Sequence, residues 1–297
     1  METVRQPAVA GTFYPGDRDA LASMVARLLA EARTGLPPHD EPVPHGETVP
    51  HHERPPHGEP VPDRPAAVPK ALICPHAGYI YSGLTAAHGY VRLEPARDTI
   101  RRVVLLGPVH HVPIRGLALP GATALRTPLG DVPVEVPEVL GTLRQVGTDV
   151  EAHRWEHSLE VQLPFLQTVL GEFTVVPMVV GQVAPAAVAE VIEALWDGPG
   201  TIVVVSSDLS HYLRYAAANG VDVATVSRIL SLEGPLESRQ ACGASPANGL
   251  LEFARTHGLH PVLYDRRTSG DTAGSKDRVV GYASIGFHET GTGAGTV

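Results

Sequence analysis

Cysteine is scarce in this chain, because only 2 of its 297 residues are Cys. Two cysteines provide no disulfide framework, and this is typical of proteins in a reducing compartment. The longest apolar run, near residues 175–181, is too short to cross a bilayer, and the opening residues lack the pattern of a signal peptide. We therefore expect a cytoplasmic protein with no membrane partner.

Positive charge and aromatic residues are also scarce. The 23 Lys and Arg residues are outnumbered by 32 Asp and Glu, which gives a net charge of −9. This balance argues against nucleic-acid binding, which needs a basic surface. Aromatic residues make up 5% of the chain, too few for a platform that stacks bases or sugars. The hydrophobic share of 43% is sufficient for a sizeable globular core.

Residues 39–62 differ sharply in composition from the rest of the chain. They form four hexapeptides, HDEPVP, HGETVP, HHERPP and HGEPVP, each beginning with His and ending with Pro. Such proline density with few apolar residues favours solvated, extended chain over packed structure. We interpret the segment as a disordered insertion in a surface loop, and a metal-scavenging arm is the alternative.

Two short apolar runs, at residues 71–74 and 103–106, are each bounded by turn residues. Runs of this kind are typical of buried parallel strands. The residues between them predict a helix over 82–91 with Ser82 as its N-cap. A β-α-β unit of this form belongs to an open α/β sheet, which carries its chemistry at the carboxyl ends of the strands.

Histidine follows both runs at that edge. His76 comes after the first strand and His110 after the second. Because the two strands are predicted to be parallel, the two imidazoles are brought to one rim of the sheet. We interpret them as half of a metal site.

The remainder of the chain continues the α/β pattern. Further strands are predicted at residues 173–180 and 201–205, and an antiparallel pair at 260–266 and 278–287. A helix is predicted at residues 136–146, and another begins at Pro246.

Two histidines hold a divalent metal poorly, so a third ligand is needed. Cys242, Asp208 and Glu160 are the candidates. Cys242 precedes a predicted helix, whose dipole favours the thiolate that binds metal. A His₂Cys set suits Fe(II), Cu or Zn, whereas His₂ with a carboxylate is the facial triad of non-haem iron oxygenases. The residues alone leave this choice open.

Asp208 and His211 follow the strand predicted at residues 201–205 and suggest acid–base chemistry. An imidazole can transfer a proton near pH 7, and a nearby carboxylate can fix its tautomer. The alternative for Asp208 is a residue that caps the next turn. Near the N-terminus, Phe13 is either part of an arm packed on the core or a lining residue of a pocket. The chain has no Gly-x-Ser-x-Gly elbow, P-loop or Gly-x-Gly-x-x-Gly motif after a strand, so neither serine hydrolysis nor nucleotide binding has support.

Five ordered motifs carry a resemblance to a known family. The chain resembles the MEMO protein family, whose prokaryotic members are called AmmeMemoRadiSam system protein B. The similarity covers nearly the whole chain apart from the hexapeptide segment. It implies one α/β domain over residues 1–297, with a mixed, mostly parallel central sheet flanked by helices, similar to class III extradiol non-haem iron dioxygenases. The motifs are PHAGYIYSG (75–83), LGPVHHVP (106–113), EHSLEVQLPF (156–165), VVSSDLSHY (204–212) and ACGASP (241–246).

The resemblance also implies roles for particular residues. Its metal ligands fall on His76, His110 and Cys242, with Fe(II) as the expected metal and Cu or Zn as alternatives. His211 corresponds to the acid–base histidine of the dioxygenase relatives, and we expect Asp208 to support it. In those relatives the third ligand is a glutamate, whereas this chain has cysteine. Residues expected to line the pocket or to lie behind the ligands are His157, Glu160, His111, Tyr79 and Phe13.

Two functions follow as hypotheses. The first is a mononuclear Fe(II) oxidoreductase of a bacterial cytoplasm, acting on a small aromatic or phenolic substrate. The second is a non-catalytic iron- or copper-binding protein that acts with radical-SAM and AMMECR-type protein partners.

Overall fold

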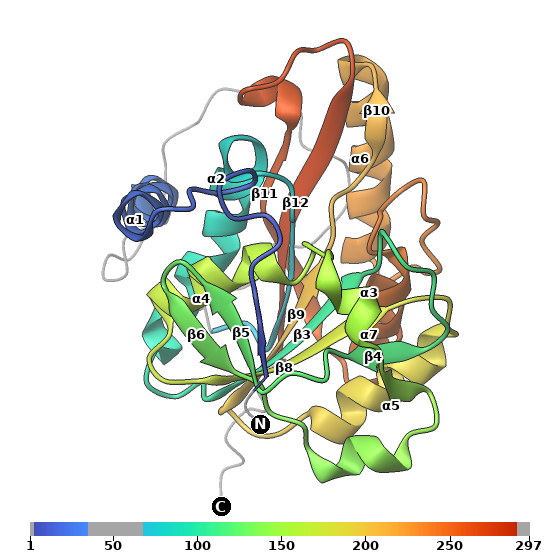
Figure 1. The fold of residues 1–297 in the computed structure, drawn as a ribbon. Helices are drawn as coiled ribbons and strands as arrows, with labels where there is room; N and C mark the ends of the chain where they lie inside the picture. Colours follow the sequence, from blue (N-terminus) through green and yellow to red (C-terminus); the bar gives the residue numbers. More distant parts are fainter. Residues whose placement is uncertain (1–2, 35–67, 290–297) are drawn as a thin grey trace, which may run out of the picture.

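The apolar runs of the sequence form the centre of a large sheet in the computed structural model, which describes residues 3–34 and 68–289 (Figure 1). Within these residues nine strands form one sheet. Their order is β10 (His211–Leu213), β12 (Val279–His288), β2 (Ala71–Cys74), β9 (Thr201–Ser206), β3 (Arg102–Pro108), β8 (Thr174–Val180), β4 (Leu117–Leu119) and β7 (Val146–Thr148), and β11 (His260–Thr268) also pairs with β12.

The central strands β2, β9, β3 and β8 run parallel, and antiparallel pairs are added on both sides. The predicted antiparallel pair near the C-terminus is β11 with β12. An α/β fold with a mixed sheet flanked by helices is therefore confirmed, although parallel pairing dominates only at its centre. The two predicted strands of the β-α-β unit are not neighbours, because β9 lies between them.

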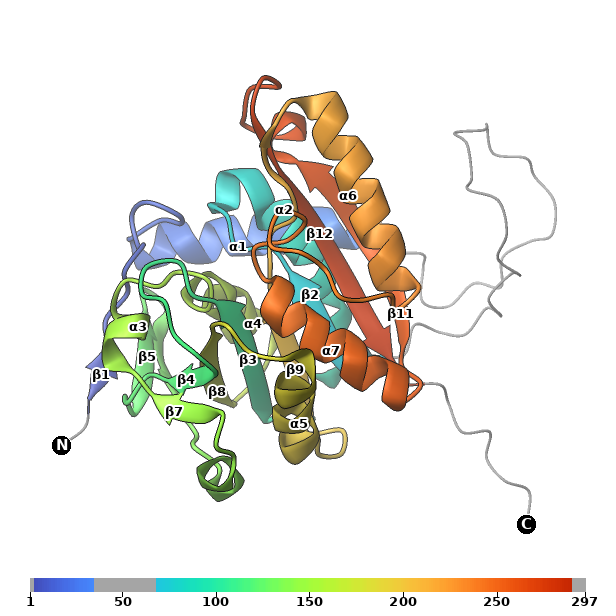
Figure 2. The same cartoon turned by 90° about the vertical axis from the view of Figure 1, so that its right-hand side faces the viewer.

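Helices cover both faces of the sheet (Figure 2). Alternate side chains of each central strand enter different cores, so that Leu72 and Cys74 of β2 face one layer while Ala71 and Ile73 face the other. Such burial on both faces explains why these strands read as continuous apolar runs. The first layer contains α1 (Arg18–Thr34), α2 (Tyr79–Tyr90) and α4 (Leu163–Val169), and the second contains α5 (Pro185–Leu195), α6 (Tyr215–Leu230) and α7 (Ala244–Thr256).

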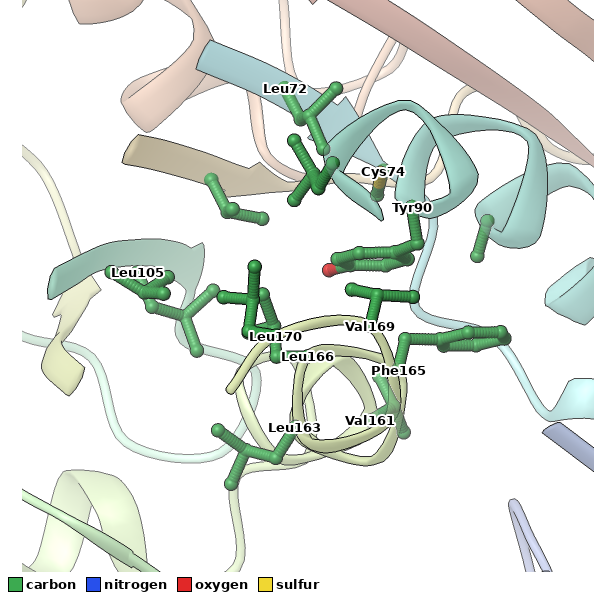
Figure 3. Packing of buried hydrophobic residues seen from close by; sticks show 14 of the residues in the cluster. Leu72, Cys74, Tyr90, Leu105, Val161, Leu163, Phe165, Leu166, Val169 and Leu170 are labelled. Atoms are coloured by element: carbon green, nitrogen blue, oxygen red, sulfur yellow. The ribbon is translucent and has the colours of Figure 1, made fainter. Parts of the chain in front are cut away.

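Tyr90 and Phe165 are at the centre of the first core (Figure 3). Their rings stack with centroids 5.1 Å apart and planes inclined by 4°. The Tyr90 hydroxyl donates a hydrogen bond of 2.7 Å to Gln162 Oε1. Because Gln162 also reaches the carboxyl end of the sheet, the packing of this core bears directly on the position of the site described below.

Smaller elements join the N-terminus to the main body. Residues 4–5 pair in parallel with a hairpin that follows β4, which fixes the start of the chain beside the sheet. These elements are β1 (Val4–Arg5), β5 (Ala124–Thr127), β6 (Gly130–Pro133), α3 (Val150–Arg154), η1 (Val91–Ala96), η2 (Glu138–Thr142), η3 (Glu160–Gln162) and η4 (Ser269–Asp271).

Two predicted helices are confirmed but begin earlier than expected, and a third helix prediction was wrong. The helix after β2 begins at Tyr79, with Gly78 as N-cap, and Ser82 donates to the Ala77 carbonyl within its first turn. The helix before β11 begins at Ala244, two residues earlier than Pro246. Residues 136–146 form only the short η2, because Leu140 is its one buried residue and supplies no apolar stripe.

The hexapeptide segment at residues 39–62 lies outside the described residues. In the described part of the chain, none of the helices combines the length and apolar character required to cross a membrane.

The packing of α2 gives a test of this architecture. A Cβ added at Gly89 would lie 2.4 Å from Ser284 Oγ and 2.9 Å from Cys74 Sγ. We expect Gly89→Ala to lower the free energy of unfolding by about 1–3 kcal/mol, since the core there has no room for a methyl group. Urea unfolding measures the difference. The matched control is Gly220→Ala in α6, where a Cβ meets nothing within 4 Å and a gain of up to about 1 kcal/mol is expected.

Candidate metal centre

Three histidine rings meet at the carboxyl ends of the central strands. His76 lies two residues beyond β2, His110 two residues beyond β3, and His157 precedes η3. Each offers one ring nitrogen, and the three nitrogens lie within 4.8 Å of one another. The His110 and His157 rings are stacked 4.7 Å apart, and His76 meets both edge-on at 5.3 and 5.5 Å.

Hydrogen bonds fix the tautomer of His76. The Ser206 hydroxyl donates its proton to the Ser158 carbonyl (2.6 Å) and accepts from Gln162 Nε2 (2.8 Å). Its contact of 2.8 Å with His76 Nδ1 therefore requires that Nδ1 carries the proton and donates it. The lone pair then resides on His76 Nε2, the atom that faces the other rings and can bind a metal.

The buried carboxylate of Glu156 fixes the tautomer of His110. Glu156 accepts from His110 Nδ1 (2.8 Å) and from the His110 backbone N–H (2.6 Å). It also accepts from the backbone N–H groups of His157 and Ser158, both at 2.9 Å. Burial alone would raise the pKa of Glu156, but the His110 ring and these N–H groups lower it to about 2. With Nδ1–H directed at Glu156, the Nε2 lone pair of His110 is free.

The protonation states favour metal ligation by two of the rings. Burial and the neighbouring His110 lower the pKa of His76 to about 3, and burial and His76 lower that of His157 to about 4. Both imidazoles are thus neutral at pH 7, the form that binds metal. Burial also acts to lower the pKa of His110, but its bond to Glu156 raises it overall.

Cys242 contacts the same ring nitrogen of His76. Its Sγ is 3.2 Å from His76 Nε2 and accepts from the Asp208 backbone N–H at 3.3 Å. Burial and the charge of Asp208 raise the pKa of this thiol. The helix N-terminus was expected to favour the thiolate, whereas burial and the charge of Asp208 act in the opposite direction. Cys74, the other cysteine, is buried in the core.

Asp208 and His211 flank the histidine cluster. Asp208 Oδ1 accepts from the His76 backbone N–H at 2.7 Å, and burial raises the pKa of this carboxyl. His211 Nδ1 lies 2.9 Å from the Leu209 carbonyl, so Nδ1 carries a proton, and in the neutral ring Nε2 has the lone pair.

Two hollows open on this cluster. One of about 630 Å³ is lined by the histidines and by aromatic rings, including Phe13, Tyr81 and Tyr282. The other, of about 760 Å³, is bordered by Cys242 and by charged residues that include Arg228 and Glu237. Both are lined by His110 and His211, so the cluster is accessible from two sides. Phe13, for which the sequence left two interpretations, lines the first hollow with its ring 4.7 Å from His157.

Comparison with known proteins identifies the family. A family model described as Memo-like protein matches residues 5–286. The chain belongs to the Memo-like family. A MEMO1 family protein of Methanopyrus kandleri is 35% identical over 304 residues, covering 95% of this chain and 98% of its own. MEMO1 family proteins of Thermotoga sp. strain RQ2 and Aquifex aeolicus are each 33% identical over 298 residues, covering 94% and 96% of this chain and 98% and 99% of theirs. The resemblance inferred from the motifs is confirmed, and relatives occur in archaea and bacteria.

Three residues expected to line the pocket or to lie behind the ligands are not among the lining residues of the first hollow in this Memo-like chain. Glu160 is buried behind the cluster, paired with Arg5 and bonded to the backbone N–H groups of Ala8 and Val9. Tyr79 is part of the core and donates to the Val161 carbonyl. His111 is exposed, with its ring 6.4 Å from that of His157.

The sequence reasoning missed three supporting residues: Glu156, Ser206 and Gln162. Glu156 could have been suspected because it directly precedes His157, and Ser206 because it ends an otherwise apolar strand. Gln162 carries no such signal, since its role depends on contacts with Pro75, Ser206 and Tyr90 from other elements.

The Glu160 carboxylate gives a prediction for stability. It also accepts from the Tyr14 hydroxyl at 2.5 Å, so it fastens the segment that carries Phe13. We expect Glu160→Ala to cost about 3–5 kcal/mol in urea unfolding, because it leaves the Arg5 charge buried without its partner. The control is Glu94→Ala at the exposed pair with Arg33, where the expected change is at most about 1 kcal/mol. Equal losses would contradict the anchoring role.

A second prediction concerns pH and the buried His153, whose Nε2 contacts the Ala118 carbonyl at 2.7 Å. Burial lowers the pKa of His153 to about 4, although that hydrogen bond opposes the shift. Since an unfolded histidine titrates near pH 6.5, the unfolded chain binds an extra proton between these values, and stability falls as the pH drops from 6.5 to 4. His153→Gln should remove about 3 kcal/mol of that decline, as measured by urea unfolding across this range. His260→Gln, at an exposed position, should leave the slope unchanged.

Proposed function

We propose that this Memo-like chain binds one metal ion and acts as a non-haem Fe(II) oxidoreductase of the dioxygenase type. The observation that carries the proposal is that His76 and His110 direct Nε2 lone pairs into one space, each held by a hydrogen bond at Nδ1. Ligand histidines in metalloproteins are oriented by the same kind of bond at their other nitrogen. Such paired support is unnecessary for histidines that only fill a core.

We assign Cys242 as the third ligand. Its sulfur lies 3.2 Å from His76 Nε2, and a bound cation would offset the burial that now keeps it a thiol. Two imidazoles and a thiolate suit Fe(II), and also Cu or Zn. His157 is the competing third ligand, because its ring nitrogen is grouped with those of His76 and His110.

The proposed substrate is a small aromatic or phenolic molecule. The hollow beside the histidines holds about 630 Å³ and has Phe13, Tyr81 and Tyr282 in its wall, which suits one aromatic ring. His211 lines the same hollow, and its neutral form has the lone pair on Nε2, so that form can accept the proton of a phenolic hydroxyl. Ferrous iron, when bound, would supply the binding and activation of dioxygen. A likeness to class III extradiol dioxygenases is part of this proposal.

The alternative is a non-catalytic iron- or copper-binding protein that acts with radical-SAM and AMMECR-type partners. Cysteine in place of the glutamate of the dioxygenase relatives favours this function. A thiolate beside iron and dioxygen is prone to oxidation.

Anaerobic reconstitution of the full chain with Fe(II) separates these functions. We expect one tightly bound iron per chain and an EPR signal on addition of nitric oxide, because catalysis needs an open coordination position. Bound metal without that signal would favour the binding protein. A screen of catechols and other phenols for oxygen consumption then tests the substrate class.

Variants test the ligands. His76→Ala should abolish the tightly bound equivalent, and Glu156→Gln should weaken iron binding by about 10–100-fold, because it removes the negative charge that His110 Nδ1–H is bonded to. His111→Ala, at the exposed neighbour of His110, is the control and should bind as the natural chain does. If Cys242→Ala loses iron and His157→Ala keeps it, Cys242 is supported as the third ligand. If His157→Ala loses iron and Cys242→Ala keeps it, the third ligand is His157.

The histidines of the hexapeptides need a separate control. A chain without residues 39–62 should retain the first equivalent of iron with unchanged affinity. If the deletion abolishes that equivalent while His76→Ala does not, the proposed centre is wrong.

A further inference from the structure

Asp222 is a carboxylic acid in the interior of the protein, on α6 and outside the histidine cluster. Its side chain is fully buried. Oδ1 accepts a hydrogen bond of 3.0 Å from the Ser210 backbone N–H, whereas Oδ2 has no hydrogen-bond partner among the described residues. Burial of an acid is costly, so a fully buried carboxyl with one bond calls for an explanation.

The hydrogen bond from Ser210 N–H to Asp222 is one of several that hold the turn carrying His211. Leu209 N–H donates to the Gly281 carbonyl and Gly281 N–H donates to the Ser210 carbonyl, both at 2.8 Å. The Leu209 carbonyl accepts from His211 Nδ1 at 2.9 Å. With these groups paired, the Ser210 N–H remains, and Asp222 accepts it. The tautomer of His211 thus depends on a carbonyl in a turn held from β12 and from α6.

The turn needs this support because its next residue is strained. Tyr212 has a φ of +59°, a left-handed conformation that side chains other than glycine adopt at a cost. The ladder with β12 is irregular at the same point, between His211 and Leu213. Contacts from outside the turn must therefore hold its geometry.

Gly281 shows how closely the acid is fitted. A Cβ at this position would lie 1.9 Å from Asp222 Oδ2, so the carboxyl packs directly against the backbone of β12. Burial raises the pKa of Asp222, while Ser210, Arg266 and His211 act to lower it. Oδ1 accepts from the Ser210 N–H, and the amide of asparagine resembles the carboxyl in shape and in its ability to accept from this N–H.

We propose that Asp222 is a positioning residue for His211. It holds the Ser210 backbone so that the Leu209 carbonyl receives the His211 Nδ1 proton and Nε2 stays unprotonated toward the hollow. The inference depends on the proposed function in one respect, namely that His211 accepts a substrate proton. The placement of the ring can be measured without substrate or metal.

The test is the tautomer of His211, read from ¹⁵N NMR of the metal-free full chain at a pH where histidines are neutral. In the natural chain the Nδ1–H form should dominate. Asp222→Leu fills the same space without an acceptor, and we expect it to shift His211 to a mixture with the Nε2–H form. Asp222→Asn should retain the natural spectrum, because its amide oxygen still accepts from Ser210 N–H.

Thr225→Val is the matched control, since Thr225 is buried in the same helix and its hydroxyl bonds only to Val221 among the described residues. It should leave the His211 signals unchanged whatever its effect on the melting temperature. If Asp222→Leu does not fold, Gly281→Ala displaces the same carboxyl and should shift the tautomer likewise. Natural His211 signals in the folded Leu or Ala variant, or loss of the Nδ1–H form in Asp222→Asn, would overturn the proposal.

Iron binding separates this inference from the proposed function. Asp222→Leu should bind iron as the natural chain does, because Asp222 contacts none of the proposed ligands. If Asp222→Leu binds iron normally and the His211 tautomer shifts, both the metal centre and the positioning role of Asp222 are supported. A shifted tautomer in a chain that binds no iron supports the inference and contradicts the metal centre.

Discussion

Buried carboxylates that accept backbone N–H bonds hold the loops of the site in place. A loop has no ladder or helix to satisfy its amides, and a charged or polar acceptor in the interior does so at a defined position. In this protein four such acids each fasten a different segment. Glu156 binds the amides of residues 110, 157 and 158, Asp208 that of residue 76, Glu160 those of residues 8 and 9, and Asp222 that of residue 210.

The core and the site are joined through one hydroxyl. Ser206 ends β9 and contacts His76, Ser158 and Gln162. Gln162 is bonded in turn to Tyr90, whose ring packs in the core of the first helical layer (Figure 3). Because the proton of Ser206 is committed to a backbone carbonyl, His76 has a single tautomer that satisfies the network. Packing in the core thus determines which nitrogen faces the proposed metal.

The same arrangement explains how neutral and charged groups coexist in a small volume. Desolvation lowers the pKa of His76 and His157, so these rings carry no charge, whereas Glu156 stays ionised because its N–H partners compensate for burial. The cluster therefore combines the neutral rings of His76 and His157 with the negative charge of Glu156, an arrangement that would favour a cation. Burial and Asp208 act to keep Cys242 a thiol.

The sequence by itself determined the central strands, the pairing of β11 with β12, the family, and the presence of His76 and His110 at strand ends. Each of these depends on local pattern: apolar runs between turn residues, or motifs of a few adjacent residues. It failed at residues 136–146, where a run of helix-compatible residues had no apolar stripe to bury. Only the tertiary structure decided the insertion of β9 between β2 and β3, the grouping of the His157 ring nitrogen with those of His76 and His110, and the partners Glu156, Ser206, Gln162 and Asp222. These depend on atoms from segments distant in sequence, because desolvation and hydrogen-bond geometry are properties of the packed chain.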